Sequence, residues 1–233
     1  MKPSAHNSIH LALLSLLATV CSSCTAPSSA DATNNLAYKE YVAGHQLNSA
    51  GKFKEAIPHL DKAIAADPTL ADAYISRGFS YGKLGPNNSE MLEHSLSDYA
   101  KAIALTPEEP HGYNNRGFTL LKLNKIDQAI ADFDFALKLE PDAAYLFGNR
   151  GEAYLRKGEL DKAISDATRA IELNPEDADP FATRGDAWLR QKNYTKAIKD
   201  YDSAIELNPT PADCFHDIEA IKAKREEAKL AGR

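Results

Sequence analysis

The stretch DYDSAIELNP, at residues 200–209, occurs in this chain in five similar versions. The other four are HLDKAIAADP (59–68), DYAKAIALTP (98–107), DFDFALKLEP (132–141) and DATRAIELNP (166–175). The closing prolines of the last four copies follow one another at intervals of 34 residues, and the first interval is 39. A fixed period of this length indicates a repeat protein, in which no single unit buries its own apolar face and stacked units build a continuous core.

Counting back from these prolines divides the chain into five units, here called repeats one to five: 37–70, 71–109, 110–143, 144–177 and 178–211. Repeat two carries five extra residues near Pro86, and positions are counted without them. Gly recurs at position 8, Ala at positions 20 and 27, and bulky residues at positions 4, 11 and 24. Steps of three and four residues predict two amphipathic helices per repeat, and the closing proline ends the second.

This pattern resembles the tetratricopeptide repeat (TPR) family over about residues 37–211. The resemblance implies an all-α fold, a TPR superhelical solenoid of antiparallel helix pairs. A solenoid must cover its last apolar face, and residues 212–233 predict a capping helix and tail with Phe215, Ile218 and Ile221 on one stripe.

The first residues differ from the repeats. Residues 1–23 have the layout of a bacterial signal peptide, with Lys2 near the start, an apolar run over 9–20 and small polar residues after it. They resemble a lipoprotein signal peptide, which implies lipidation of Cys24, with Cys21 as the alternative. An ordinary cleaved signal and an uncleaved anchor stay open. Residues 24–36 predict a flexible tether, and we expect a periplasmic, lipid-anchored protein of the bacterial cell envelope.

The composition argues against several function classes. The net charge of −6 is not typical of a nucleic-acid-binding protein, which carries clustered basic residues. No run of about 18 apolar residues predicts a membrane-spanning helix, so contact with a membrane is expected only through a lipid anchor. The sequence contains no phosphate loop, nucleophile turn or zinc-binding pair of known spacing. We therefore expect no enzymatic activity, no metal and no cofactor.

Two positions vary together and indicate a structural ion pair. Arg at position 7 and Asp at position 23 are both present in repeats two to five, and repeat one has Ala43 and His59 instead. This joint presence and absence predicts an Arg–Asp bridge between the two helices of a repeat, which would set their register.

The TPR resemblance implies that the first helices line a concave groove that binds a partner. The groove residues carried over in this way are Tyr38, Tyr41, His45, Phe79, Lys83, Asn114, Phe118, Lys122, Tyr145, Arg156 and Arg190. Position 13 is basic in four successive repeats, which favours an extended, acidic or carboxylate-bearing peptide as partner. The alternative is that position 13 is simply solvated.

The expected function is a non-catalytic scaffold or adaptor of the bacterial envelope that binds a protein or peptide in this groove. A cytoplasmic TPR co-chaperone or assembly adaptor is the alternative. The Lys and Asn clamp of chaperone-binding TPR proteins is not matched, since the corresponding positions hold Tyr41, His45, Ser76, His111 and Asn115. A third hypothesis is an accessory chain of an enzyme.

Overall fold

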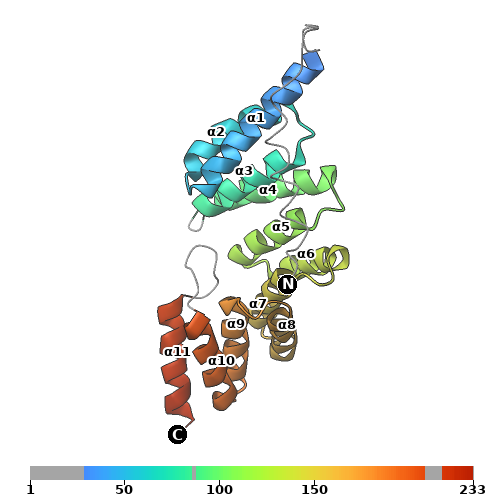
Figure 1. The fold of residues 1–233 in the computed structure, drawn as a ribbon. Helices are drawn as coiled ribbons and strands as arrows, with labels where there is room; N and C mark the ends of the chain where they lie inside the picture. The colour runs from blue at the N-terminus through green and yellow to red at the C-terminus, as the bar shows by residue number, and fades with distance from the viewer. Residues whose placement is uncertain (1–28, 86–87, 208–216, 233) are drawn as a thin grey trace, which may run out of the picture. The chain divides into compact units, whose positions relative to one another are not determined.

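The computed structural model describes residues 29–85, 88–207 and 217–232, with side chains from Asn35 onward. These residues form 11 α-helices and no strand (Figure 1). The helices are α1 (Ser29–Ser49), α2 (Phe53–Ala66), α3 (Ala71–Leu84), α4 (Ser89–Leu105), α5 (Pro110–Lys122), α6 (Ile126–Leu139), α7 (Ala144–Lys157), α8 (Leu160–Leu173), α9 (Ala178–Arg190), α10 (Tyr194–Leu207) and α11 (Ile218–Ala231). Residues 33–233 form one compact unit, and residues 1–32 form another, of which only 29–32 are described.

Within the larger unit, helices packed against their sequence neighbours confirm the predicted solenoid. From α2 to α11, each pair of consecutive helices is in contact. The first helices of successive repeats also touch one another, α3 with α5, α5 with α7, and α7 with α9. The first helices therefore lie side by side and share one face of the stack.

Close approach of the paired helices depends on glycine at position 8. A Cβ on Gly117 would lie 2.7 Å from the ring of Phe133, and one on Gly185 would lie 2.7 Å from the ring of Tyr201. Both rings are fully buried. Each aromatic ring at position 24 thus fills the space that a side chain at position 8 would need, which explains the recurring small–large pattern.

The extra residues of repeat two lengthen its second helix. α4 has 17 residues, whereas each of the other second helices has 14. Asn88 caps it, because its side chain accepts hydrogen bonds from the backbone N–H groups of Glu90 and Met91. Part of the insertion near Pro86 is therefore an additional helical turn.

The second half of the predicted tether over 24–36 lies in α1. α1 begins at Ser29, eight residues before the first repeat. Once a helix has started, each further residue adds one hydrogen bond for the one residue that it fixes, so extending a helix is easier than starting one. The signal-peptide prediction, with Cys21 and Cys24, lies outside the described residues.

The last described helix caps the stack. α11 packs against α10 and α9, and it buries Ile221 and Ala228 almost completely. Ile218 of the predicted stripe is half-buried, and Phe215 lies outside the described residues. Among the described helices, none is both long and apolar enough to cross a membrane.

Candidate functional site

Two adjoining cavities lie along the first helices of the amino-terminal repeats. The larger has a volume of about 680 Å³ and is lined by His45, Asn48, Ser49, Gly51, Phe53, Ile75, Ser76, Phe79, Lys83 and Asn115. The smaller, of about 280 Å³, is lined by Phe79, Gly82, Lys83, Tyr99, Asn114, Asn115, Phe118, Thr119, Lys122, Tyr145 and Asn149. Phe79, Lys83 and Asn115 belong to both, so the cavities form one continuous site, here called the groove.

Aromatic rings form its apolar part. Phe79 of α3 meets Phe53 of α2 edge to face, with ring centroids 5.9 Å apart. Tyr41 continues the row beyond the cavities, with its ring 5.8 Å from His45 and 6.0 Å from Tyr38. Burial, and then the nearby carboxylate of Asp72, raises the pKa of Tyr41 to about 12, so this phenol keeps its proton at neutral pH.

Two lysines stand over the rings of the groove. The Lys83 ammonium lies 5.2 Å from the centre of the Phe79 ring, and the Lys122 ammonium lies 4.9 Å from that of Phe118. Such cation–π contacts hold a lysine beside an apolar surface. Among the described residues that line the two cavities, none is an aspartate or glutamate, so the local charge of the groove is positive although the whole chain is acidic.

Side-chain amides form the polar part of the groove. Asn149 of α7 donates a hydrogen bond from Nδ2 to Oδ1 of Asn114 of α5, at 2.8 Å. Asn48 donates to the Ser76 carbonyl at 2.8 Å and accepts from the Ser80 hydroxyl at 2.6 Å. An amide carries both a donor and an acceptor, the same pair that an extended peptide backbone presents.

The basic residues at position 13 have a role that neither sequence interpretation included. Lys122 donates to the carbonyl oxygen of Gly82 at 3.1 Å, Arg156 to that of Leu121 at 3.2 Å, and Arg190 to that of Leu155 at 2.7 Å. Each of these carbonyl groups belongs to position 12 of the preceding repeat, at the carboxyl end of its first helix. Carbonyl groups there lack partners within the helix, and the helix dipole favours a cation beside them. These side chains link successive repeats.

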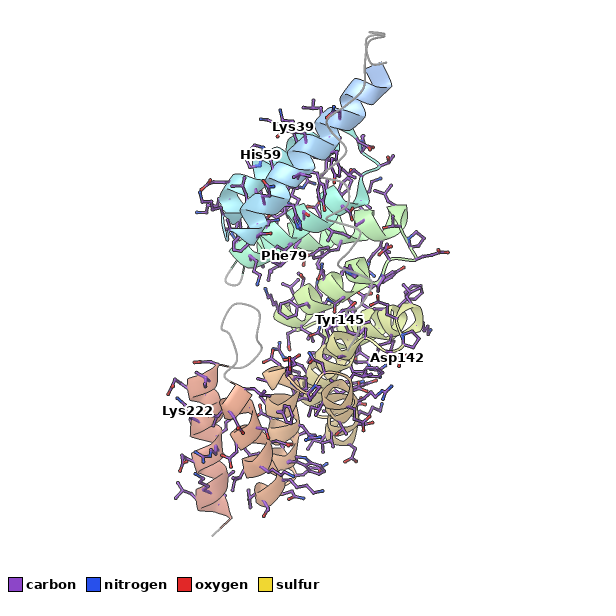
Figure 2. The ribbon with its side chains drawn as sticks, in the orientation of Figure 1. Lys39, His59, Phe79, Asp142, Tyr145 and Lys222 are labelled. Carbon is purple, nitrogen blue, oxygen red and sulfur yellow. The ribbon has the colours of Figure 1, made fainter. Side chains whose placement is uncertain are left out.

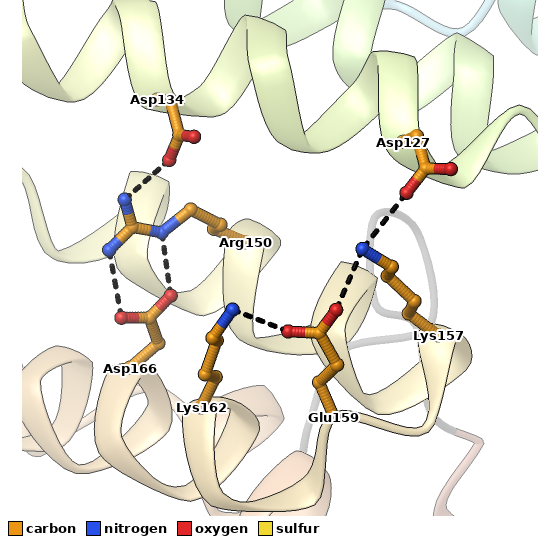
Figure 3. Close-up of polar contacts among 7 residues, drawn as sticks. All are labelled: Asp127, Asp134, Arg150, Lys157, Glu159, Lys162 and Asp166. Atoms are coloured by element: carbon orange, nitrogen blue, oxygen red, sulfur yellow. Dashed lines mark hydrogen bonds and ion pairs between the residues drawn. The ribbon is translucent and has the colours of Figure 1, made fainter.

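The Arg–Asp bridges are confirmed in all four repeats that carry the pair. In repeat four, Arg150 donates through Nε and Nη2 to the two oxygens of Asp166, at 2.7 and 2.9 Å (Figure 3). Its remaining nitrogen, Nη1, reaches Asp134 of repeat three at 2.7 Å. The arginine therefore fixes the two helices of its own repeat and also joins that repeat to the one before.

Repeat one joins its two helices through a different pair, between position 23 and position 4. His59 and Glu40 are joined at 2.6 Å between Nδ1 and Oε2, and this hydrogen bond lowers the pKa of Glu40. Glu40 stands at position 4, where the later repeats have a bulky residue, and His59 stands at position 23, where they have aspartate. Each of these two polar replacements provides the hydrogen-bonding partner of the other.

Models of protein families match three parts of the chain. A "TPR repeat" model covers residues 44–85, and two "Tetratricopeptide repeat" models cover 114–182 and 178–211. The chain contains tetratricopeptide repeats.

Other TPR-containing proteins resemble it in sequence over part of their length. Tetratricopeptide repeat protein 13 of Homo sapiens is 30% identical over 100 residues, which are 43% of this chain and 11% of that protein. The Hsp70-Hsp90 organizing protein of Triticum aestivum is 30% identical over 95 residues, which are 41% of this chain and 16% of that protein. The chain spans only a small fraction of the length of these curated TPR relatives.

Solved TPR structures show the same fold. YrrB, described as a TPR protein with an unusual peptide-binding site, is 25% identical with a TM-score of 0.59, over 84% of this chain and 100% of YrrB. TTC0263, a thermophilic TPR protein of Thermus thermophilus, is 20% identical with a TM-score of 0.65, over 83% of this chain and 99% of that protein.

The structure brings most of the TPR groove residues predicted from sequence into the two cavities. These are His45, Phe79, Lys83, Asn114, Phe118, Lys122 and Tyr145. Phe79 and Tyr145, labelled in Figure 2, come from α3 and α7. Tyr38 and Tyr41 extend the row along α1, whereas Arg156 and Arg190 line neither cavity and bond to the preceding repeat.

Sequence reasoning missed several members of the groove. Asn115 and Asn149 occupy position 6, directly before the bridging arginine, so the NRG triplets of repeats three and four contained the signal. Phe53 begins α2, and it was not predicted to line the groove because the TPR resemblance assigned the groove to the first helices.

At the other end of the stack, Asp186 at position 9 accepts a hydrogen bond from Tyr201 at 2.8 Å and pairs with Lys224 of the capping helix.

Proposed function

We propose that this TPR chain is a non-catalytic interaction module that binds an extended peptide segment of a partner protein in the groove. The observation that supports it is the continuity of two cavities across repeats one to four through the shared residues Phe79, Lys83 and Asn115. Peptide binding in YrrB, a TPR protein of similar fold, agrees with this proposal.

The chemistry of the groove defines the peptide. An apolar side chain fits the larger cavity beside Phe53 and Phe79, because burying it removes apolar surface from water. The asparagine amides match the donors and acceptors of an extended backbone. Lys83 and Lys122 favour a segment that carries carboxylates, and this electrostatic share of the affinity should weaken as salt increases.

The test uses peptides selected from a random library against the full chain. Affinities would be measured by fluorescence polarisation for the wild type, for Phe79→Ala and for Phe135→Ala. Phe135 is a matched control, since its aromatic ring is exposed on α6 and lines neither cavity. We expect Phe79→Ala to weaken binding about tenfold or more, as truncation of an interface anchor does, and Phe135→Ala to leave it unchanged. Equal affinities for all three proteins would show that the groove is not the site.

We also propose that the protein acts in the bacterial envelope, tethered by a lipid on Cys24, or on Cys21 as the alternative. The support is the sequence layout of residues 1–23. The mass of the mature amino terminus tests this. A chain that starts at either cysteine with added acyl mass supports the proposal. An intact Met1 in the cytoplasmic fraction would favour a co-chaperone or assembly adaptor, the role suggested by the name of the Triticum aestivum relative.

A further inference from the structure

A separate cavity of about 270 Å³ lies where repeats four and five meet, among α8, α9 and α10. It is lined by Thr168, Arg184, Trp188, Lys196, Lys199 and Asp200. None of these residues lines the groove. Three of them are cations and one is a carboxylate, so the lining has an excess of two positive charges in a chain whose net charge is −6.

The single carboxylate is fully engaged by one of the cations. Arg184 donates through Nε and Nη2 to both oxygens of Asp200, each at 2.8 Å. Its Nη1 donates to the Thr168 hydroxyl at 3.1 Å. Because that hydroxyl oxygen accepts the bond from Arg184, its own proton can be donated to a ligand. The charges of the two lysines remain without a carboxylate among the residues of this cavity.

The preceding junction, between repeats three and four, shows what the same architecture looks like when its charges balance (Figure 3). Asp134 stands where this cavity has Thr168, and it takes the third nitrogen of Arg150 at 2.7 Å. Glu159 pairs with Lys162 at 2.6 Å, and the residues that correspond to this pair at the next junction are Asn193 and Lys196. Ser165 corresponds to Lys199. The two junctions therefore differ at three positions, and each difference makes the charge of the later junction more positive.

The other junctions lack the excess as well. Between repeats one and two, Arg77 is bonded by both Asp61 and Asp98, and Ser97 takes the place of Lys199. Between repeats two and three, the two lysine positions hold Gln128 and Ala131. At the cap, Asp202 of repeat five pairs with Arg225 of α11 at 2.6 Å. Among the described junctions, only the one between repeats four and five concentrates positive charge.

The geometry points to a binding site for a doubly charged phosphate group, either free phosphate or a phosphate monoester. The Lys196 ammonium is held 4.1 Å from the centre of the Trp188 ring, and Lys199 follows it by about one turn of α10. Two ammonium groups, the Thr168 hydroxyl and the half-buried Arg184 guanidinium provide donors for a tetrahedral oxyanion from several sides. The inference does not depend on the proposed peptide groove.

Trp188 makes the site directly observable, because it is the only tryptophan of the chain. Its fluorescence would be followed while inorganic phosphate or O-phosphoserine is added to the full chain, with sodium chloride holding ionic strength constant. Equilibrium dialysis with radiolabelled phosphate is the second readout, which also detects binding that leaves the fluorescence unchanged. We expect saturable binding of at least one of the two ligands. If the protein binds inorganic phosphate as tightly as it binds O-phosphoserine, the free ion is identified as the ligand. If its affinity for O-phosphoserine is at least tenfold higher, the monoester is identified as the ligand.

Two substitutions make the test specific. Thr168→Asp restores the carboxylate that the preceding junction carries at Asp134, so the variant is expected to fold, which circular dichroism would verify. The added negative charge should weaken phosphate binding about tenfold or more. Lys162→Ser, at the balanced junction, should leave binding unchanged. The proposal is overturned if neither ligand binds saturably in either readout, or if Thr168→Asp binds as tightly as the wild type.

Discussion

At the scale of single residues, position 15, between the two helices of a repeat, requires a left-handed backbone conformation in four of the repeats. Gly51, Asn124, Gly158 and Lys192 occupy this position with φ of 73°, 56°, 85° and 62°. Glycine adopts this left-handed region without steric cost, and asparagine tolerates it, whereas lysine does not favour it.

Replacing Lys192 by glycine should therefore stabilise the protein. Relief of the strained φ is worth about 1–2 kcal/mol, and the entropic cost of glycine removes part of this, so we expect a net gain of about 0.5–1 kcal/mol. Urea unfolding followed by circular dichroism measures it. Gly158→Ala is the reverse experiment, since nothing lies within 4 Å of the added Cβ. It should lower stability, and a rise there would contradict the backbone argument.

The Arg150 bridge allows a second comparison at this scale, because one arginine holds two carboxylates of different exposure (Figure 3). The Asp166 side chain is 10% exposed and the Asp134 side chain is 45% exposed. Asp166→Ala should cost about 3 kcal/mol, since it leaves a half-buried guanidinium without its bidentate partner. Asp134→Ala should cost less than about 1 kcal/mol. Equal losses in unfolding free energy would mean that burial does not decide the strength of this network.

At the scale of elements, the capping helix combines apolar burial with a partly buried ion pair. Ile221 and Ala228 cover the core of repeat five, whose Tyr201 is fully buried. Asp186, also buried, accepts a hydrogen bond from Tyr201 and pairs with Lys224 of α11. The ion pair fixes how α11 sits on α9 and α10, because a buried carboxylate needs its partners in place.

Lys224→Met should loosen the cap. It removes the ammonium partner of Asp186 and should cost about 1–3 kcal/mol, with faster hydrogen exchange in α11 and α10. Lys222→Met is the matched control, because Lys222 pairs at the exposed surface with Glu219 and should change stability by less than about 0.5 kcal/mol. If both variants exchange like the wild type, the Asp186 contact does not hold the cap.

The capping helix also shows how far sequence reasoning reaches. Its existence was predictable, because a stack must end in a polar-backed element, and the Arg–Asp bridges were predictable from their joint absence in repeat one. The hydrogen bonds from position 13 were not, because they join residues 35 and 40 positions apart whose proximity exists only after the repeats stack. Phe53 entered the groove for the same reason, since its position depends on the angle between α2 and α3.

At the scale of the whole molecule, stability depends on how strongly neighbouring repeats are coupled. In a linear stack, each repeat contacts only its neighbours, so cooperative unfolding requires interface energies that exceed the differences between repeats. Three side chains supply a recurrent link: Lys122, Arg156 and Arg190 each donate to a helix-end carbonyl of the preceding repeat. The third nitrogen of the bridging arginine adds a parallel link in repeats two, four and five.

Replacing Arg190 by methionine should weaken the interface between repeats four and five more than either repeat itself. The apolar stem is retained and the hydrogen bond to the Leu155 carbonyl is lost, at a cost of about 1–2 kcal/mol. Hydrogen exchange should then accelerate in α9 and α10 while α3 to α6 keep their protection, and the urea transition should broaden because the last repeat unfolds earlier. Lys162→Met is the control, since Lys162 pairs with Glu159 inside its own repeat, and it should leave both observables unchanged. A uniform loss of protection along the stack in Arg190→Met would mean instead that the repeats unfold as one unit, with coupling far stronger than these carbonyl bonds provide.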